Sequence, residues 1–75
     1  MLYKRSSFLS WLSDVKDCDV NPIRDTNVVI IKNGPASARM WIDTKDRIDY
    51  EEIWLICNKL YIDGLPGEKE LTRIE

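Results

Sequence analysis

The sequence contains no histidine and only two cysteines, Cys18 and Cys57, among 75 residues. Histidine is the commonest general base and a frequent metal ligand. Its absence excludes a Ser-His-Asp or Cys-His catalytic site and any zinc site that uses histidine. Two thiols cannot supply the four ligands of a structural zinc ion. The sequence therefore predicts a protein that is not an enzyme and that uses no metal and no cofactor.

Long apolar runs are also missing. No segment approaches the roughly 20 apolar residues that cross a bilayer, and no apolar leader with a small-residue cleavage site precedes the fold. These absences predict a cytoplasmic protein with reduced thiols. Without repeats or a linker, residues 1–75 are expected to form one small domain. Its tail, residues 67–75, is expected to be a short helix, an edge segment or partly frayed.

A strong charge of one sign is lacking as well. Eleven Lys and Arg residues against thirteen Asp and Glu residues give a net charge of -2. Proteins that bind nucleic acid through phosphates usually have a clear basic surplus, so a protein partner is favoured over nucleic acid. A local site stays open, because Lys32 and Arg39 flank a loop beside Trp41 and this set suits stacking and phosphate contact.

What is present begins with an amphipathic segment. Phe8, Trp11, Leu12 and Val15 follow the i, i+3, i+4, i+7 spacing of one helical face. This spacing predicts a helix over residues 7–17, with Ser6 or Ser7 as the N-cap.

Two strands and a loop are expected next. Residues 27–32, "NVVIIK", have four successive apolar β-branched residues, which predicts a strand buried on both faces. Residues 37–43 alternate, with Ala38, Met40 and Ile42 on one face and Ser37, Arg39, Trp41 and Asp43 on the other. Because Pro35 has no N–H to close a turn centred on Asn33-Gly34, a loop of four or five residues, 33–37, is expected between them. A further strand near residues 20–24, which contain Pro22, is left open.

The second helix has the clearest start. Asp49 and Glu52 have capping-box spacing, and Ile48 could contact Ile53 across the first turn. Gly64 is placed as the C′ residue, with Pro66 preventing continuation. The stripe expected to face the sheet consists of Tyr50, Ile53, Trp54, Cys57, Leu60 and Tyr61.

These elements predict an α+β fold. The expected architecture is a small two-layer domain in which two helices pack an antiparallel sheet of two or three strands, in the order α-β-β-α or α-β-β-β-α.

A carboxylate cluster provides one chemical alternative. Acidic residues gather at Asp43, Asp46, Asp49, Glu51 and Glu52. Such a cluster could bind Mg²⁺ or act as an acid-base pair, although its spacing does not follow an EF-hand loop. Asp49 and Glu52 are already explained by capping, so solvated or capping acids are the favoured interpretation.

Apolar residues outside the core pattern bear on function. Projected on a helix, Leu55 and Ile62 lie on the side away from Tyr50 and Cys57, and Trp41 lies on the second sheet face. Either the first helix covers that sheet face and Leu65 and Leu71 of the tail cover Leu55 and Ile62, or the surplus is a binding surface.

The preferred hypothesis is a non-catalytic interaction module. It would be an adaptor or inhibitor that binds another protein or a second copy of itself as a homodimer. Its size is typical of phage and mobile-element proteins. Its expected partner-binding residues are Trp41, Arg39, Leu55, Ile62 and Glu51.

An alternative comes from element order. Over residues 7–66, where the late helix ends in "DGLP", the chain resembles the double-stranded-RNA-binding-like fold of HicA-type toxins. The resemblance implies an RNA-binding module. Those toxins place a catalytic histidine on a strand, and this chain has none, so the resemblance does not extend to nuclease activity.

Overall fold

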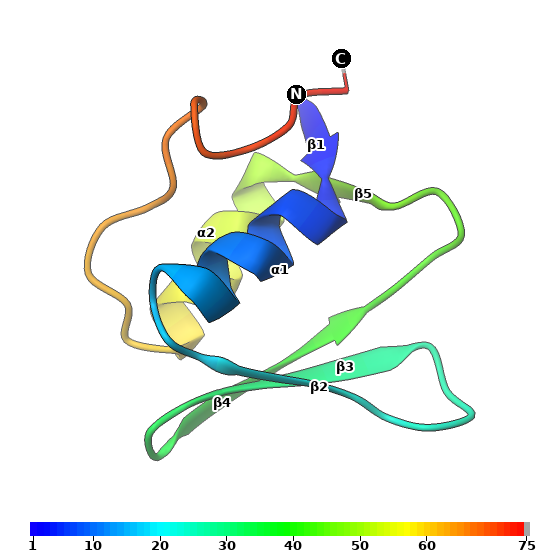
Figure 1. The fold of residues 1–75 in the computed structure, drawn as a ribbon, viewed down its shortest axis with the longest axis vertical. Helices are drawn as coiled ribbons and strands as arrows, with labels where there is room; N and C mark the ends of the chain where they lie inside the picture. Colours follow the sequence, from blue (N-terminus) through cyan, green and yellow to red (C-terminus); the bar gives the residue numbers. More distant parts are fainter. Residues whose placement is uncertain (75) are drawn as a thin grey trace.

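Three consecutive antiparallel strands form the main sheet of the protein. The computed structural model describes residues 1–74, and β3 is the central strand between β2 and β4 (Figure 1). The elements, in chain order, are β1 (Leu2–Lys4), α1 (Arg5–Asp14), β2 (Asp19–Pro22), β3 (Val28–Asn33), β4 (Ala36–Trp41), β5 (Arg47–Asp49) and α2 (Tyr50–Lys59). The α+β class and the α-β-β-β-α order are thereby confirmed, with β1 and β5 added as a separate two-stranded sheet.

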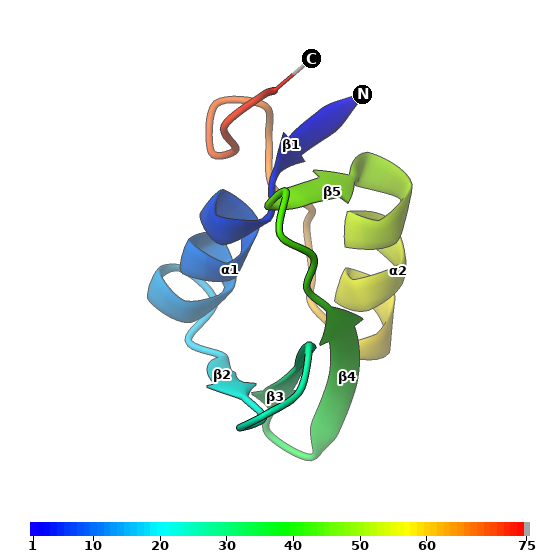
Figure 2. The same ribbon diagram turned by 90° about the vertical axis from the view of Figure 1, so that its right-hand side faces the viewer.

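Both helices lie on the same face of the main sheet. Figure 2 shows both helices above the sheet, α1 toward the β2 edge and α2 toward the β4 edge, with no element of residues 1–74 on the opposite side. The prediction that β3 is buried on both faces was wrong, and the alternative in which the first helix covers the second face does not hold. Val29 and Ile31 are buried beneath the helices, whereas Val28 and Ile30 are only partly buried. An unbroken apolar run does not reveal that one face lacks a cover.

The edge strands follow from their sequences. The uncertain segment near residues 20–24 forms β2, in which Pro22 is the last residue of an edge strand, where proline is tolerated. The alternation of β4 is confirmed, because Ala38 and Met40 are buried and Arg39 and Trp41 are exposed.

The β3–β4 connection is tighter than expected. Asn33 pairs with Ala36, so only Gly34 and Pro35 form the turn, and the predicted loop of four or five residues was wrong. Gly34 has φ +59°. A positive φ at the first central position followed by proline, whose φ is fixed near -65°, suits a type II′ turn. In this register Pro35 occupies the second central position, where the turn needs no N–H from it.

The N-terminus of α1 is capped from a distant loop. The helix begins at Arg5, two residues before the predicted start, and Lys4 at the N-cap position makes no side-chain cap bond. Instead, the Asp46 carboxylate accepts from the Ser6 backbone N–H at 2.9 Å and from the Ser6 hydroxyl at 2.7 Å. The Asp46 carbonyl accepts from the Arg5 N–H at 3.0 Å. A cap supplied by a residue 40 positions later leaves no signal at the helix start itself.

The C-terminal end of α1 also differs. The helix ends at Asp14 rather than at residue 17, and Val15 is the C-cap. Phe8, Trp11 and Leu12 are buried as predicted, but Val15 is 62% exposed and does not join the core face.

The start of α2 agrees with its sequence. Asp49 is the N-cap, and its carboxylate accepts from the Glu51 N–H at 3.2 Å. The buried residues of the helix are Ile53, Ile56 and Cys57, followed by Leu60 at the C-cap. Trp54 and Tyr61 were wrongly placed in this stripe, because apolar residues at 53–57 and 60–62 allow two overlapping stripes and burial selects the one that contains Ile56.

The end of α2 is a Schellman motif at Tyr61. The Tyr61 N–H donates to the Asn58 carbonyl at 3.2 Å, and the Ile62 N–H donates to the Cys57 carbonyl at 3.0 Å. Tyr61 has φ +53°, a conformation that usually favours glycine. The prediction of Gly64 as the C′ residue was therefore wrong. Ile62 follows the motif and packs against the core, so it is not on a helical line with Leu55.

The tail returns to the N-terminus as an edge segment. Tyr3 forms a β-bridge with Arg73, the Lys4 N–H donates to Thr72, and the Ile74 N–H donates to Leu2. Leu71 is buried in the core. The described part of the tail is thus ordered against β1, and Glu75 lies outside the described residues. Within residues 1–74, no helix has the length and apolar character needed to span a membrane.

Candidate functional site

The uncovered face of the main sheet is the first candidate site. We call it the open sheet face. The strand register places successive cross-strand pairs on this face, namely Val28 with Trp41, Ile30 with Arg39, and Lys32 with Ser37. On the other side of β3, Asn21 pairs with Ile30 and Asp19 pairs with Lys32.

Trp41 dominates one end of the open sheet face. Its side chain is 72% exposed, although tryptophan is normally well buried in a small domain. Its cross-strand partner Val28 and the diagonal neighbour Ile30 are partly buried. Ile23 continues the register beyond β2, because its N–H donates to the Val28 carbonyl, and it is 38% exposed. These four residues form one apolar area across three chain segments.

Positive charge gathers at the other end. Lys32, Arg39 and Lys59 line an open hollow of about 430 Å³ between the sheet and the C-terminal end of α2. None of the three makes an ion pair or a side-chain hydrogen bond with another residue of the described chain. With Asp19 they carry a charge of +2, whereas the rest of the chain, with 8 basic and 12 acidic residues, carries -4. The region where the open sheet face meets the C-terminal end of α2 is therefore basic on an acidic protein.

The structure separates the predicted binding residues into three places. Trp41 and Arg39 share the open sheet face. Leu55 and Glu51 lie on the solvent side of α2, where Leu55 is 47% exposed. Ile62 is partly buried, packs against the core and lies beyond the end of α2. Leu55 is not covered by Leu65 or Leu71, contrary to the structural alternative.

Sequence reasoning missed several exposed side chains. Trp54 is 50% exposed and Tyr61 is 84% exposed, and both had been assigned to the core. Lys59 was not predicted as part of the basic hollow, because no local sequence signal indicates that the end of α2 lies beside β4. Adjacent apolar residues such as Trp54 and Leu55 could have indicated that α2 has more apolar side chains than one helical face holds.

The acidic loop before β5 has structural partners. Arg5 is 8% exposed, and its guanidinium donates to the Asp43 carboxylate at 3.1 Å and to the Asp43 carbonyl at 3.0 Å. Asp46 lies 3.6 Å from the same guanidinium. The hydrogen bond from Arg5 holds the pKa of the Asp43 carboxyl below its ordinary value.

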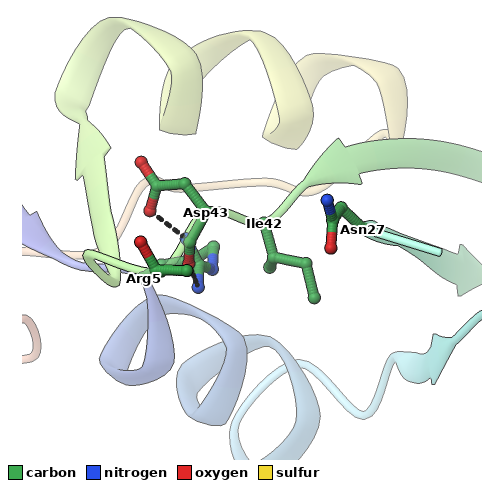
Figure 3. A pocket seen from close by; sticks show the side chains of 5 residues that line it. Arg5, Asn27, Ile42 and Asp43 are labelled. Atoms are coloured by element: carbon green, nitrogen blue, oxygen red, sulfur yellow. Dashed lines mark hydrogen bonds and ion pairs between the residues drawn. The ribbon is translucent and has the colours of Figure 1, made fainter. Parts of the chain in front are cut away.

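These contacts bear on the metal alternative. Figure 3 shows Arg5 directed toward Asp43, with Ile42 and Asn27 along the same hollow of about 380 Å³. Asp43 and Asp46 are engaged with Arg5 and α1, and Asp49 caps α2. Residues 1–74 contain no group of three or more acidic or cysteine side chains arranged to hold a metal ion.

Both cysteines are free and buried. Burial raises the pKa of the Cys18 thiol, and it raises the pKa of the Cys57 thiol to about 11. Because the thiolate is the nucleophilic form, neither side chain has the character of a reactive cysteine.

Comparison with known proteins does not assign a function. No protein family, curated protein or solved structure matches this chain. The open sheet face and the solvent side of α2 therefore have to be interpreted from their own chemistry.

Proposed function

We propose that the protein is a non-catalytic interaction module that binds another protein through the open sheet face. The observation that carries this proposal is Trp41, which is 72% exposed beside Val28 and Ile30 on a sheet face with no cover. Contiguous exposed apolar area on a small protein often marks an interface, and tryptophan is among the strongest interface anchors. The module would act as an adaptor or an inhibitor, with no chemistry of its own.

Charge defines the kind of partner. Lys32, Arg39 and Lys59 border the apolar area and have no counterions within residues 1–74. A partner that fits this surface has an apolar strip, which covers Trp41, next to acidic side chains. Complementary charge at the rim of an interface speeds association and fixes orientation more than it adds affinity. We also place the protein in the cytoplasm, where its two free thiols stay reduced.

A nucleic-acid strand is the second candidate. Trp41 could stack on a base while Arg39 and Lys32 contact phosphates. The protein partner is favoured because the neighbours of Trp41 are aliphatic and offer no second stacking surface. The absence of binding to a single-stranded or double-stranded RNA oligonucleotide at low ionic strength would dispose of this alternative, whereas binding that weakens steeply with salt would replace the protein partner.

Site-specific photo-crosslinking tests the protein partner. A photoreactive amino acid at Ser37 places the crosslinker on the open sheet face, and the matched control carries it at Asp14 on α1, which is also exposed. The expected result is a protein captured from Ser37 and not from Asp14. A capture pattern that is the same for both positions would contradict the proposal.

Affinity measurements with the purified captured protein complete the test. Trp41→Ala should weaken binding by about 30-fold or more, as expected for an interface hot spot. Arg39→Glu should reduce the association rate, with a loss that shrinks at high salt. Trp54→Ala removes an exposed tryptophan from α2 and is the matched control, with an expected change below about twofold.

A further inference from the structure

The solvent side of α2 carries a second surface, which meets the hollow beside the open sheet face only at Lys59. Glu51, Leu55 and Lys59 are spaced four residues apart, so they form one ridge along the helix. All three are exposed. Figure 2 shows α2 at the rim of the molecule, with no other element over its outward side.

This ridge is complementary to itself. Leu55 lies midway between the acidic residue in the first turn and the basic residue in the last turn. The ends of the ridge are about 12 Å apart at 1.5 Å per residue. If a second α2 lies antiparallel across a twofold axis at Leu55, each Glu51 meets the other copy's Lys59 and the two leucines meet at the centre. Within residues 1–74, neither charged side chain has an ion-pair partner.

We infer that the chain forms a homodimer through antiparallel packing of α2 on α2, centred on Leu55. A twofold interface requires one patch to fit itself, and a ridge with opposite charges at its ends and an apolar centre meets this requirement. Trp54, half exposed beside Leu55, supplies further apolar contact area. One ten-residue helix from each copy gives a small interface, so the dimer is weak and forms at high micromolar concentrations.

A competing explanation assigns the charges to the helix alone. Glu51 in the first turn and Lys59 in the last turn each interact favourably with the dipole of α2. That explanation does not account for the exposure of Leu55. It also predicts that charge reversal affects only the stability of the single chain, whereas the dimer predicts a specific pattern of pairing between variants.

The experiment is sedimentation equilibrium between about 10 µM and 1 mM, a range that brackets weak association. The wild-type mass should rise from 8.8 kDa toward twice that value. Glu51→Lys and Lys59→Glu should each stay monomeric, because every end of the ridge then meets a like charge. An equimolar mixture of the two variants should dimerise again, because the two chains then carry opposite charges at both contacts.

Control variants on and away from the ridge distinguish the dimer from a general effect of the substitutions. Leu55→Asp should be monomeric alone and in every mixture, whereas Trp41→Ala on the open sheet face should dimerise like the wild type. Asp14→Lys and Lys69→Glu reverse exposed charges away from the ridge and should also leave the dimer intact. A wild type that stays at 8.8 kDa throughout, or a mixture of the two charge variants that stays monomeric, would overturn the inference. An equal loss of dimerisation in the control variants Asp14→Lys and Lys69→Glu would also overturn the inference.

Discussion

The distant cap on α1 allows a quantitative test of how this fold is held together. Asp46 satisfies the Ser6 N–H at the start of the helix and stands 3.6 Å from the Arg5 guanidinium. Removing an N-terminal cap typically costs about 1 kcal/mol. Asp46 also has φ +51°, where alanine costs about 1 kcal/mol more than residues that adopt this conformation readily.

Three substitutions separate these contributions. Asp46→Ala should lower the free energy of unfolding by about 2 kcal/mol, because it loses the cap and adopts an unfavourable φ. Asp46→Gly loses the cap but tolerates the φ, so its loss should be about 1 kcal/mol. Asp46→Asn keeps an oxygen that can accept from the Ser6 N–H, and its loss should be the smallest of the three.

Urea unfolding followed by circular dichroism measures this series. A domain of 75 residues is expected to have a total stability of about 4–11 kcal/mol, so the alanine variant should lose a substantial part of it and melt about 8–16 °C lower. Equal losses in the alanine and glycine variants would refute the φ contribution. Changes below about 0.5 kcal/mol in all three would refute the cap itself.

Three further predictions concern the helix end, the sheet and pH. Tyr61→Gly should raise the free energy of unfolding by up to about 1 kcal/mol in urea unfolding, because the exposed tyrosine sits at φ +53°; a lower stability would contradict the Schellman assignment. Ile31→Ala should cost about 2–5 kcal/mol and Ile30→Ala clearly less, since Ile31 is fully buried and its neighbour faces the open side; equal losses would mean that both faces are covered. The lowered pKa of the Asp43 carboxyl contributes stability that is present above the ordinary pKa of 3.8 and is lost as pH falls through the pKa of the folded state. The stability difference between wild type and Asp43→Asn should therefore shrink on acidification. A constant difference in pH-dependent unfolding would argue against the Arg5 contact.

Local sequence signals predicted much of the fold. The N-cap Asp49, the alternation of β4 and the buried face around Phe8 depend on spacing within a few residues, and each agrees with the structure. The α+β class follows from the order of these segments.

The errors arose where distant contacts decide the outcome. The strands β1 and β5 have three residues each and pair across more than 40 positions of chain, which no local pattern reveals. The capping of α1 by Asp46 has the same origin. The turn at Gly34-Pro35 was missed because a two-residue turn was considered only at Asn33-Gly34, one residue earlier, where Pro35 has no N–H to close it.

The candidate site was predicted in part. Trp41 and Arg39 were placed on a common sheet face by their alternation, and the structure places them there. This face is open because both helices pack on the opposite face of the sheet, which the apolar run of β3 could not indicate. Ile62 does not lie on a helical line with Leu55, because α2 ends at Lys59 and the chain turns back at Tyr61.

The central claim is that the open sheet face is used for binding rather than for folding. Titration of the ¹⁵N-labelled protein with the captured partner tests this claim most directly. We predict that chemical-shift changes concentrate on Ile30, Arg39 and the Trp41 indole N–H, and that α1 is unaffected. Changes that concentrate on α1 or on the tail, with the Trp41 indole signal unmoved, would contradict the proposed role of this face.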